Sequence, residues 1–412
     1  MDGVAERWEV SRVEQVFRDV YGQAVATLVR VFGDISLAED AVQDAFLVAS
    51  DRWPRTGIPP NPAGWIITTA RNRAIDTLRR SKRGAELVDQ LVPPAASSVP
   101  ADTNEEETMV RDDQLRLIFT CCHPALRPEH QVALTLRLLG GLTVGEVARS
   151  FLVSESAMEK RLVRARYKIK AANIPYRIPP DSELPHRLRS VLSVVYLIYN
   201  SGADDPDRGA LRHEAIRFGR ALGELMPDEP EVAGLLGLML LNDARVPARA
   251  VGGAVVLLRD QDRTRWDRAM IDEGHTIIRA CIRRDRPGPF QVQAAIQAVH
   301  CAATSYEETD WHQIVALYDQ LLEMQPTPIV IFNRAIAVGE VEGPDVALAA
   351  LDSVAADLDT YHLLHAARGA SLRRLGRLEA AKLAYLRAVD LAVTVQDRQF
   401  LIQQIEEFSG DK

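Results

Sequence analysis

The stretch that decides the fold lies at residues 142–166 and reads LTVGEVARSFLVSESAMEKRLVRAR. Thr143 and Glu146 have the spacing of a capping box, which predicts that a short helix begins here. A three-residue turn then leads to Ser154, a suitable N-cap for a second helix. One face of that second helix carries Lys160, Arg164 and Lys168. A short helix, a tight turn and a basic second helix predict a helix-turn-helix, whose second helix fits the major groove of DNA. The alternative is a helical hairpin with a solvated basic face.

Upstream, residues 61–80 read NPAGWIITTARNRAIDTLRR. Asn61 is a suitable cap and Pro62 a suitable first residue, so a helix is expected to run to about residue 80. An apolar stripe covers one side, and the other combines an aromatic ring, a hydroxyl and an amide with several arginines. Such a surface can engage unpaired bases and phosphates. The alternative is a solvated face with an incidental tryptophan. The residues singled out are Trp65, Thr69, Arg71, Asn72, Arg79 and Arg80.

A third helix is expected around residues 38–46, AEDAVQDAF, with Ser36 and Glu39 forming a capping box at its start. Asp40, Gln43 and Asp44 share one face at spacings of three and four residues. Phe46 lies on the opposite, apolar face. The acidic face can dock a basic partner, or it serves solubility alone. A loop rich in proline and glycine at 54–61 separates this helix from the next.

The net charge of −8 conceals an asymmetry along the chain. Residues 71–83 hold six basic side chains against one acidic one, and residues 158–172 hold the same numbers. Residues 84–113 hold one basic side chain against eight acidic ones, and their prolines and serines indicate a flexible acidic linker. Two short basic stretches in an acidic protein indicate local contacts with nucleic acid.

The composition excludes several classes of protein. A chain of 412 residues that is 47% apolar has material for two to four domain cores, so global disorder is excluded. No run of 18 apolar residues is present, so no membrane association is expected. The first residues lack the apolar core of a secretory signal, and four cysteines are too few for a disulfide framework. A cytoplasmic location is therefore expected.

From residue 185 to 407 the apolar pattern is helical throughout. Ile314, Ala347 and Ala381 are spaced by 33 and 34 residues, and the segments around them resemble tetratricopeptide (TPR) repeats. Such repeats are helix pairs that stack into a solenoid. Strand patterns are almost absent from the sequence, so the expected fold class is all-α.

The order of these segments resembles a bacterial RNA polymerase sigma factor of the extracytoplasmic-function (ECF) group. The resemblance covers about residues 10–172, and the remainder is similar to the subgroup with a long TPR-like C-terminal extension. It implies sigma region 2 at 10–83, a flexible acidic linker at 84–111, a helix-turn-helix region 4 at 112–172 and the extension at 185–410. Leu152 departs from the group's usual glycine in the turn, and Ser156-Ala157 stands where threonine or glycine-threonine is common in the group.

The resemblance also implies roles for the residues singled out. Core RNA polymerase would bind Asp40, Gln43 and Asp44, with Phe46 behind them. The helix with Trp65, Thr69, Arg71, Asn72, Arg79 and Arg80 would melt and hold the −10 element of promoter DNA. The −35 element would be contacted by Glu159, Lys160, Arg161, Val163 and Arg164. Of these, Arg161, like its neighbour Arg166, would bind phosphate or pack. The extension would bind a peptide or protein and regulate the factor in cis.

Other patterns give weaker indications of a functional site. Cys121, Cys122, His123 and His130 have poor spacing for zinc, so no metal is expected. Asp260–Asp267 could form a ligand site or an interhelical corner. No catalytic set occurs, so we expect no enzyme and no cofactor. Two alternatives remain: a helix-turn-helix activator with a TPR sensor, and an enzymatic extension regulated by the front half.

Overall fold

The computed structural model describes residues 16–17, 20–80, 103–151, 153–203, 209–251, 254–392 and 394–409. The chain divides into two compact units, Met1–Phe218 and Gly219–Lys412. Among the described residues the only strands are β1 (Ala250–Val251) and β2 (Ala254–Val255), a short antiparallel pair. The predicted all-α class is confirmed.

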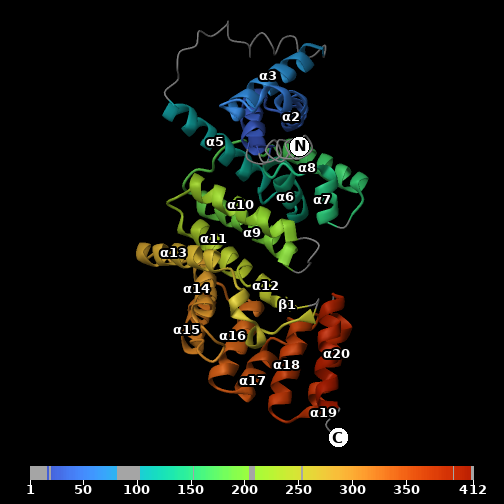
Figure 1. Cartoon of the computed structure of the whole chain (residues 1–412), viewed down its shortest axis with the longest axis vertical. Coiled ribbons are helices and arrows are strands. Elements are labelled where there is room, and N and C mark those ends of the chain that lie inside the picture. Colours follow the sequence, from blue (N-terminus) through green and yellow to red (C-terminus); the bar gives the residue numbers. More distant parts are fainter. Residues whose placement is uncertain are drawn as a thin grey trace. The chain divides into compact units, whose positions relative to one another are not determined.

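In the first unit, residues 20–32 form a helix, drawn in blue in Figure 1. Its further helices are α2 (Ile35–Thr56), α3 (Pro62–Arg80), α5 (Thr103–Cys121), α6 (Pro128–Leu134), the π-helical turn η1 (Thr135–Leu139), α7 (Val144–Ser150), α8 (Glu155–Ala171), α9 (Leu184–Ala203) and the first part of α10 (Gly209–Leu225). Residues 81–102, most of the predicted linker, lie outside the described residues.

The first helices pack around one apolar core. Tyr21 and Leu28 of the helix over 20–32, Val42 of α2 and Ile66 of α3 are each no more than 1% exposed. Between the first two helices the chain turns at Gly33, whose φ of +68° suits glycine. Helices α2 and α3 therefore have fixed inner faces, which determines the residues that they present outward.

The start of α2 differs from the prediction. Asp34 is the N-cap, and its carboxylate accepts from the backbone N–H groups of Ser36 at 2.8 Å and Leu37 at 3.1 Å. The predicted capping box of Ser36 and Glu39 is wrong, because the Glu39 side chain is buried and bonds elsewhere. The helix also extends through Pro54 to Thr56, beyond the expected loop start.

Helix α9 belongs to the first unit although it follows the predicted second DNA-binding domain. Arg187 of α9 is 8% exposed, and its guanidinium donates to the carbonyl oxygen of Phe119 in α5 at 2.6 Å. Helix α9 packs against both α5 and α6. The compact unit that contains the helix-turn-helix therefore continues past residue 185.

The second unit comprises the rest of α10 followed by α11 (Pro230–Asp243), α12 (Val246–Arg249), β1, β2, the short turns η3 (Leu258–Asp260) and η4 (Arg263–Arg265), α13 (Arg268–Arg284), α14 (Pro289–Ala302), α15 (Trp311–Met324), α16 (Pro328–Val341), α17 (Pro344–Ser353), α18 (His362–Arg374), α19 (Leu378–Leu391) and α20 (Val395–Ser409). From α13 onward each helix packs against the next one in sequence. This succession of neighbouring helices (Figure 1) is a TPR-like solenoid.

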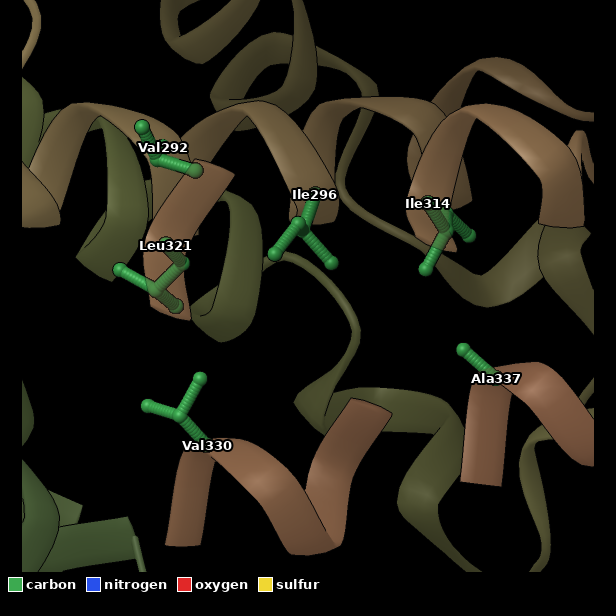
Figure 2. Packing of buried hydrophobic residues seen from close by; sticks show 6 residues of the cluster. All are labelled: Val292, Ile296, Ile314, Leu321, Val330 and Ala337. Carbon is green, nitrogen blue, oxygen red and sulfur yellow. The ribbon is translucent and has the colours of Figure 1, made fainter. Parts of the chain in front are cut away.

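The spacing read from the sequence coincides with the packing of this solenoid. Ile314, Ala347 and Ala381 lie in α15, α17 and α19, and they are 0%, 4% and 0% exposed. Figure 2 shows the cluster around the first of them, in which Val292 and Ile296 of α14, Ile314 and Leu321 of α15, and Val330 and Ala337 of α16 meet. The repeated positions thus lie in the buried contacts between successive helices.

Candidate nucleic-acid interface

The helix-turn-helix consists of α7 and α8, as the sequence predicts. The hydroxyl of Thr143 accepts from the backbone N–H of Glu146 at 3.2 Å, and the Glu146 carboxylate accepts from the Thr143 N–H at 2.7 Å. This capping box is confirmed, and so is Ser154, whose hydroxyl accepts from the Ala157 N–H at 3.3 Å. The inner face of α8 is buried at Met158, Leu162, Ala165 and Ile169.

The outer face of α8 presents both charged and apolar side chains. Glu159, Lys160, Val163 and Arg164 are all exposed. Val163 is 60% exposed and Tyr167, one turn further along, is 72% exposed. Tyr167 was not singled out from the sequence, although two large apolar residues one turn apart on a charged face indicate a contact surface. A valine can contact a thymine methyl group, and a tyrosine hydroxyl can bond a phosphate.

Two arginines of α8 contact protein instead. The guanidinium of Arg161 lies 4.9 Å from the centre of the Phe151 ring, and its side chain is half-buried. Arg166 forms an ion pair with Glu39 of α2 at 2.7 Å. The sequence left packing or phosphate binding open for both residues, and in this structure both pack. Leu152 in the turn lies outside the described residues.

Helix α2 exposes two carboxylates and, one turn further along, a leucine. Asp40 and Asp44 are exposed, while Leu47, one turn after Asp44, is 69% exposed. Gln43 is half-buried and donates to Glu39 Oε1 at 3.3 Å. Burial, followed by the neighbouring Glu39 carboxylate, raises the pKa of Asp40. Leu47 was not singled out from the sequence.

Phe46 lies behind this face and not in it. It is 4% exposed, and its ring packs edge-on against Phe17 with a centroid distance of 4.5 Å. A direct contact of Phe46 with a partner would require the core of the domain to open. Its contribution to the acidic face is to support α2 from within.

Helix α3 is capped as predicted, because the Asn61 side chain accepts from the Gly64 N–H at 2.8 Å. Asn72, Arg79 and Arg80 are exposed, and Thr69 and Arg71 are half-buried. Trp65 is half-buried and packs edge-on against the buried Trp53 at 5.3 Å between ring centroids. One helix face thus carries most of the predicted polar residues, and the Trp65 ring is partly covered by its neighbour.

Glu39 is the residue that sequence reasoning missed most clearly. Its carboxylate accepts from Arg137 Nε in η1 at 2.6 Å and lies 2.7 Å from Arg166 Nη2 in α8. Arg137 also donates to the Leu142 carbonyl at 2.6 Å. The group links α2 to η1 and α8 through buried charge.

A second ion-pair group lies on α5. Asp113, with 1% of its side chain exposed, accepts from Arg30 at 2.7 Å and from Arg116 at 3.0 Å. Burial raises the pKa of Asp113, and the hydrogen bond from Arg30 opposes that shift. The Tyr176 hydroxyl donates to the carbonyl oxygen of Ala26 at 2.8 Å.

The cysteine pair is part of the core. Cys121 and Cys122 are free and buried, and the sulfur of Cys122 lies 3.6 Å from the Thr135 hydroxyl. Burial raises the pKa of Cys122 to about 12, which disfavours the thiolate that a metal would bind. Within the described parts of the chain, no group of three His, Cys, Asp or Glu residues has the arrangement of a metal site.

The segment 260–267 forms an interhelical corner. Arg263 is 7% exposed and donates to the carbonyl oxygens of His300 at 3.0 Å and Ala303 at 2.6 Å. Its guanidinium also lies 4.7 Å from the Trp266 ring centre. Asp267 caps α13 through the Met270 N–H at 3.0 Å. These groups stabilise the fold of the extension.

Among the helices described, none is long and apolar enough to cross a membrane.

Three family models match the chain. Sigma-70 region 2 matches residues 16–84, and Sigma-70, region 4 matches residues 116–169. A family of unknown function (DUF6596) matches residues 187–282. The first two matches both lie in the first unit, one on the part with α2 and α3 and the other on the part with the helix-turn-helix.

Relatives agree with these matches. An uncharacterized protein of Rhizobium meliloti is 42% identical over 402 residues, which cover 94% of each chain. ECF RNA polymerase sigma factor SigM of Bacillus subtilis is 24% identical over 162 residues, 39% of this chain and 93% of SigM. Probable ECF RNA polymerase sigma factor SigI of Mycobacterium tuberculosis is 28% identical over 159 residues, 37% of this chain and 52% of SigI.

Among solved structures, the P58(IPK) TPR domain aligns over 97% of this chain and 100% of that chain, with 12% identity and a TM-score of 0.25. The two sigma-70 matches and the ECF relatives concern the first part of the chain. The chain thus carries sigma-70 regions 2 and 4, is similar over this part to extracytoplasmic-function sigma factors, and continues in a helical C-terminal extension.

Proposed function

We propose that this chain binds core RNA polymerase through α2, contacts the −10 element through α3, contacts the −35 element through α8, and thereby initiates transcription. The observation that carries the proposal is the combination of two exposed surfaces in one unit, an acidic face on α2 and a basic reading face on α8. The polymerase core supplies all catalysis in this scheme.

The face of α2 has the composition of a docking surface. An exposed leucine, Leu47, stands beside the carboxylates of Asp40 and Asp44. Burial of the exposed leucine can contribute to the affinity for a partner, and the carboxylates can orient a basic one. Phe46 holds the helix from behind, so the face is rigid before it meets its partner.

The face of α8 supports readout of duplex DNA. Lys160 and Arg164 can donate to guanine, and Glu159 can accept from the amino group of cytosine. Val163 and Tyr167 add apolar contact area between them. Because the four inner residues of α8 are buried, the angle of this face toward the groove is set by the domain core.

The face of α3 supports binding to single-stranded DNA. Asn72 offers hydrogen bonds to bases that have lost their partners, and Arg79 and Arg80 offer positive charge for the phosphates. Unpairing a base costs a few kcal/mol, and contacts of this kind offset part of that cost. Trp65 packs against Trp53 and is half-buried, so its exposed part can contact an unpaired base.

The test is run-off transcription with bacterial core RNA polymerase on templates from the DNA upstream of the protein's own coding sequence. The variant Asp40→Ala/Asp44→Ala should lose initiation, and a loss of about 2–3 kcal/mol of core binding would lower affinity about 30- to 150-fold. The matched control is Asp272→Ala/Glu323→Ala, which removes two exposed carboxylates from the extension. DNA binding without polymerase, together with no initiation in its presence, would favour the activator with a TPR sensor.

We further propose that the extension regulates initiation in cis by binding a peptide or protein. Support comes from its solenoid form, which exposes extended surfaces. The chain should be shortened after Glu229, since a cut at 185 would remove Arg187 from the core of the first unit. Run-off activity and core affinity equal to those of the full chain would reject regulation in cis.

A further inference from the structure

The C-terminal ends of alternate helices in the second unit lie together. Arg374, the last residue of α18, donates to Glu340 near the end of α16 at 2.9 Å. Its neighbour Arg373 donates to Glu407 near the end of α20 at 3.2 Å. Helix α14 ends on the same side as α16, because α15 runs antiparallel between them and packs against both (Figure 2). The ends of α14, α16, α18 and α20 are called the helix-end row below.

The helix-end row attracts positive charge. The last turn of each helix leaves carbonyl groups without partners inside the helix, and the aligned peptide dipoles place partial negative charge there. Glu340 adds a carboxylate, and its side chain is 18% exposed. Tyr306 keeps its proton beside this carboxylate, because burial and the charge of Glu340 raise its pKa to about 12. A guanidinium group, which can donate to carbonyl and carboxylate oxygens together, therefore fits this row.

Residues 254–266 of the chain itself lie along the helix-end row. The carbonyl oxygens that accept from Arg263 are at the end of α14. Arg259 lies 4.0 Å from Glu340 and 5.5 Å from the centre of the Tyr306 ring. At the other end β2 packs against α20, as the yellow strands beside the red helix show in Figure 1. One short segment thus reaches from α14 to α20.

The distance covered requires an extended backbone. Three steps between neighbouring helices of the row, at about 9 Å each, give about 27 Å. The nine residues from 254 to 263 span at most about 30 Å when they are extended, and about 14 Å as an α-helix. Leu257 and Gln261, on either side of the short turn η3, have extended dihedral angles. The segment therefore lies on the row as an extended peptide would.

The two ends of the segment are held unequally. Arg263 is 7% exposed with three hydrogen-bond acceptors, and Trp266 beside it is 3% exposed. By contrast, the side chain of Arg259 is 49% exposed and Leu257 is 38% exposed. An exposed ion pair at 4.0 Å contributes little to stability. The outer residues, 254–259, can therefore leave the row while the buried end stays in place.

We propose that the helix-end row is a docking surface for an extended segment of a partner protein that carries aliphatic residues followed by an arginine, and that residues 254–259 occupy this surface until the partner displaces them. The proposal rests on the proposed function of the extension, since it names the surface and the chemistry of the partner. Glu340 is the carboxylate that binds the partner's arginine. Charge favours such a partner, because residues 173–412 hold 34 acidic side chains against 26 basic ones.

The test uses the full chain and a fluorescent peptide with the sequence of residues 254–262, AVVLLRDQD. The opened variant, Val255→Ser/Arg259→Ser, removes a half-buried apolar side chain of β2 and the arginine of η3. The matched control, Ala254→Ser/Arg265→Ser, changes one apolar residue and one arginine at exposed positions of β2 and η4.

The opened variant should bind the peptide about tenfold more tightly than the parent chain and the control in fluorescence anisotropy. The reason is that the tethered segment of those two chains competes at an effective concentration of about 1 mM. Equal affinity of the opened variant and the parent chain would overturn the proposal.

A second measurement needs no variant. Peptide at millimolar concentration should accelerate amide hydrogen exchange of residues 254–259 in the parent chain, because it takes their place on the row. Exchange of residues 263–266 should stay unchanged, since Arg263 and Trp266 remain buried. Unchanged or slower exchange at 254–259 would overturn the proposal.

The chemistry of the partner is tested in the opened variant. Glu340→Gln should weaken peptide binding about tenfold, and so should glutamine in place of the peptide's arginine. Glu342→Gln, which changes an exposed carboxylate just past the end of α16, is the matched control and should leave the affinity unchanged. Full affinity after both changes would reject an arginine-bearing partner and overturn the proposal.

Run-off transcription separates this proposal from regulation in cis. Peptide that binds the opened variant and leaves initiation unchanged would support the docking surface and reject regulation through it. If the peptide does not bind and the chain shortened after Glu229 still differs from the full chain, the docking surface is overturned and regulation in cis stands.

Discussion

His300 makes the stability of the extension depend on acidity. The imidazole is 8% exposed and packs edge-on against Trp311 at 5.3 Å between ring centroids. Burial, and then the charges of Arg245 and Arg263, lower the pKa of His300 from 6.5 to about 3. The folded extension therefore holds a neutral imidazole at every pH above about 3.

In the unfolded chain this imidazole has its ordinary pKa of 6.5, so between pH 6.5 and pH 3 the unfolded state binds a proton that the folded state does not. Protonation in this range therefore favours unfolding. The contribution of His300 to the free energy of unfolding is fully present above pH 6.5 and is lost progressively as the pH falls from 6.5 toward 3. Each pH unit in that window costs about 1.4 kcal/mol, which gives a loss of about 2 kcal/mol at pH 5. A loss of this size is a large fraction of the stability of an ordinary domain.

The assay is urea denaturation of the full chain at pH 7 and at pH 5, followed by tryptophan fluorescence. His300→Gln should remove about 2 kcal/mol of the difference between the two pH values, whatever its effect on stability at pH 7. His312→Gln, an exposed histidine of α15, should leave the difference unchanged. The reasoning is refuted if His300→Gln and the parent chain lose the same free energy between pH 7 and pH 5.

Three further predictions concern single side chains. Leu47→Asp should weaken binding to core RNA polymerase about tenfold or more in a fluorescence titration, while Leu383→Asp, equally exposed on α19, should not. Lys160→Ala should lower the slope of log affinity against log salt for −35 DNA by about 0.9, provided that Lys160 contacts one phosphate. An unchanged slope would mean that it contacts none. Ile314→Ala should cost the extension about 2–5 kcal/mol in urea denaturation, because the side chain is fully buried, and Leu383→Ala should cost far less.

Local features of this fold could be predicted from the sequence. The capping box of Thr143 and Glu146 lies within one helical turn, so the spacing of these two residues is enough to predict it. The buried positions at Ile314, Ala347 and Ala381 follow from periodicity, because a solenoid repeats its contacts at fixed intervals. In both cases the partners are near in sequence or recur at one interval.

Long-range contacts could not be predicted in this way. Ser36 and Glu39 have the spacing of a capping box, but the Glu39 carboxylate bonds Arg137, which is 98 residues away. Nothing local distinguishes a glutamate that caps a helix from one that fills a charged pocket. The exposure of Leu47 and the burial of Arg187 depend likewise on how distant helices pack, which a pattern within one helix does not contain.

Ion pairs in the solenoid repeat at the interval of the helix pairs. Arg374 contacts Glu340 at 2.9 Å and Arg373 contacts Glu407 at 3.2 Å, and each pair spans 34 residues. An insertion of a few residues between two such partners would move them out of reach of each other, whereas the addition of a whole helix pair would preserve every neighbour. Addition or loss of a complete helix pair at the end of the extension is therefore the change of length that best keeps these contacts, and each added pair would extend the surface by the same amount.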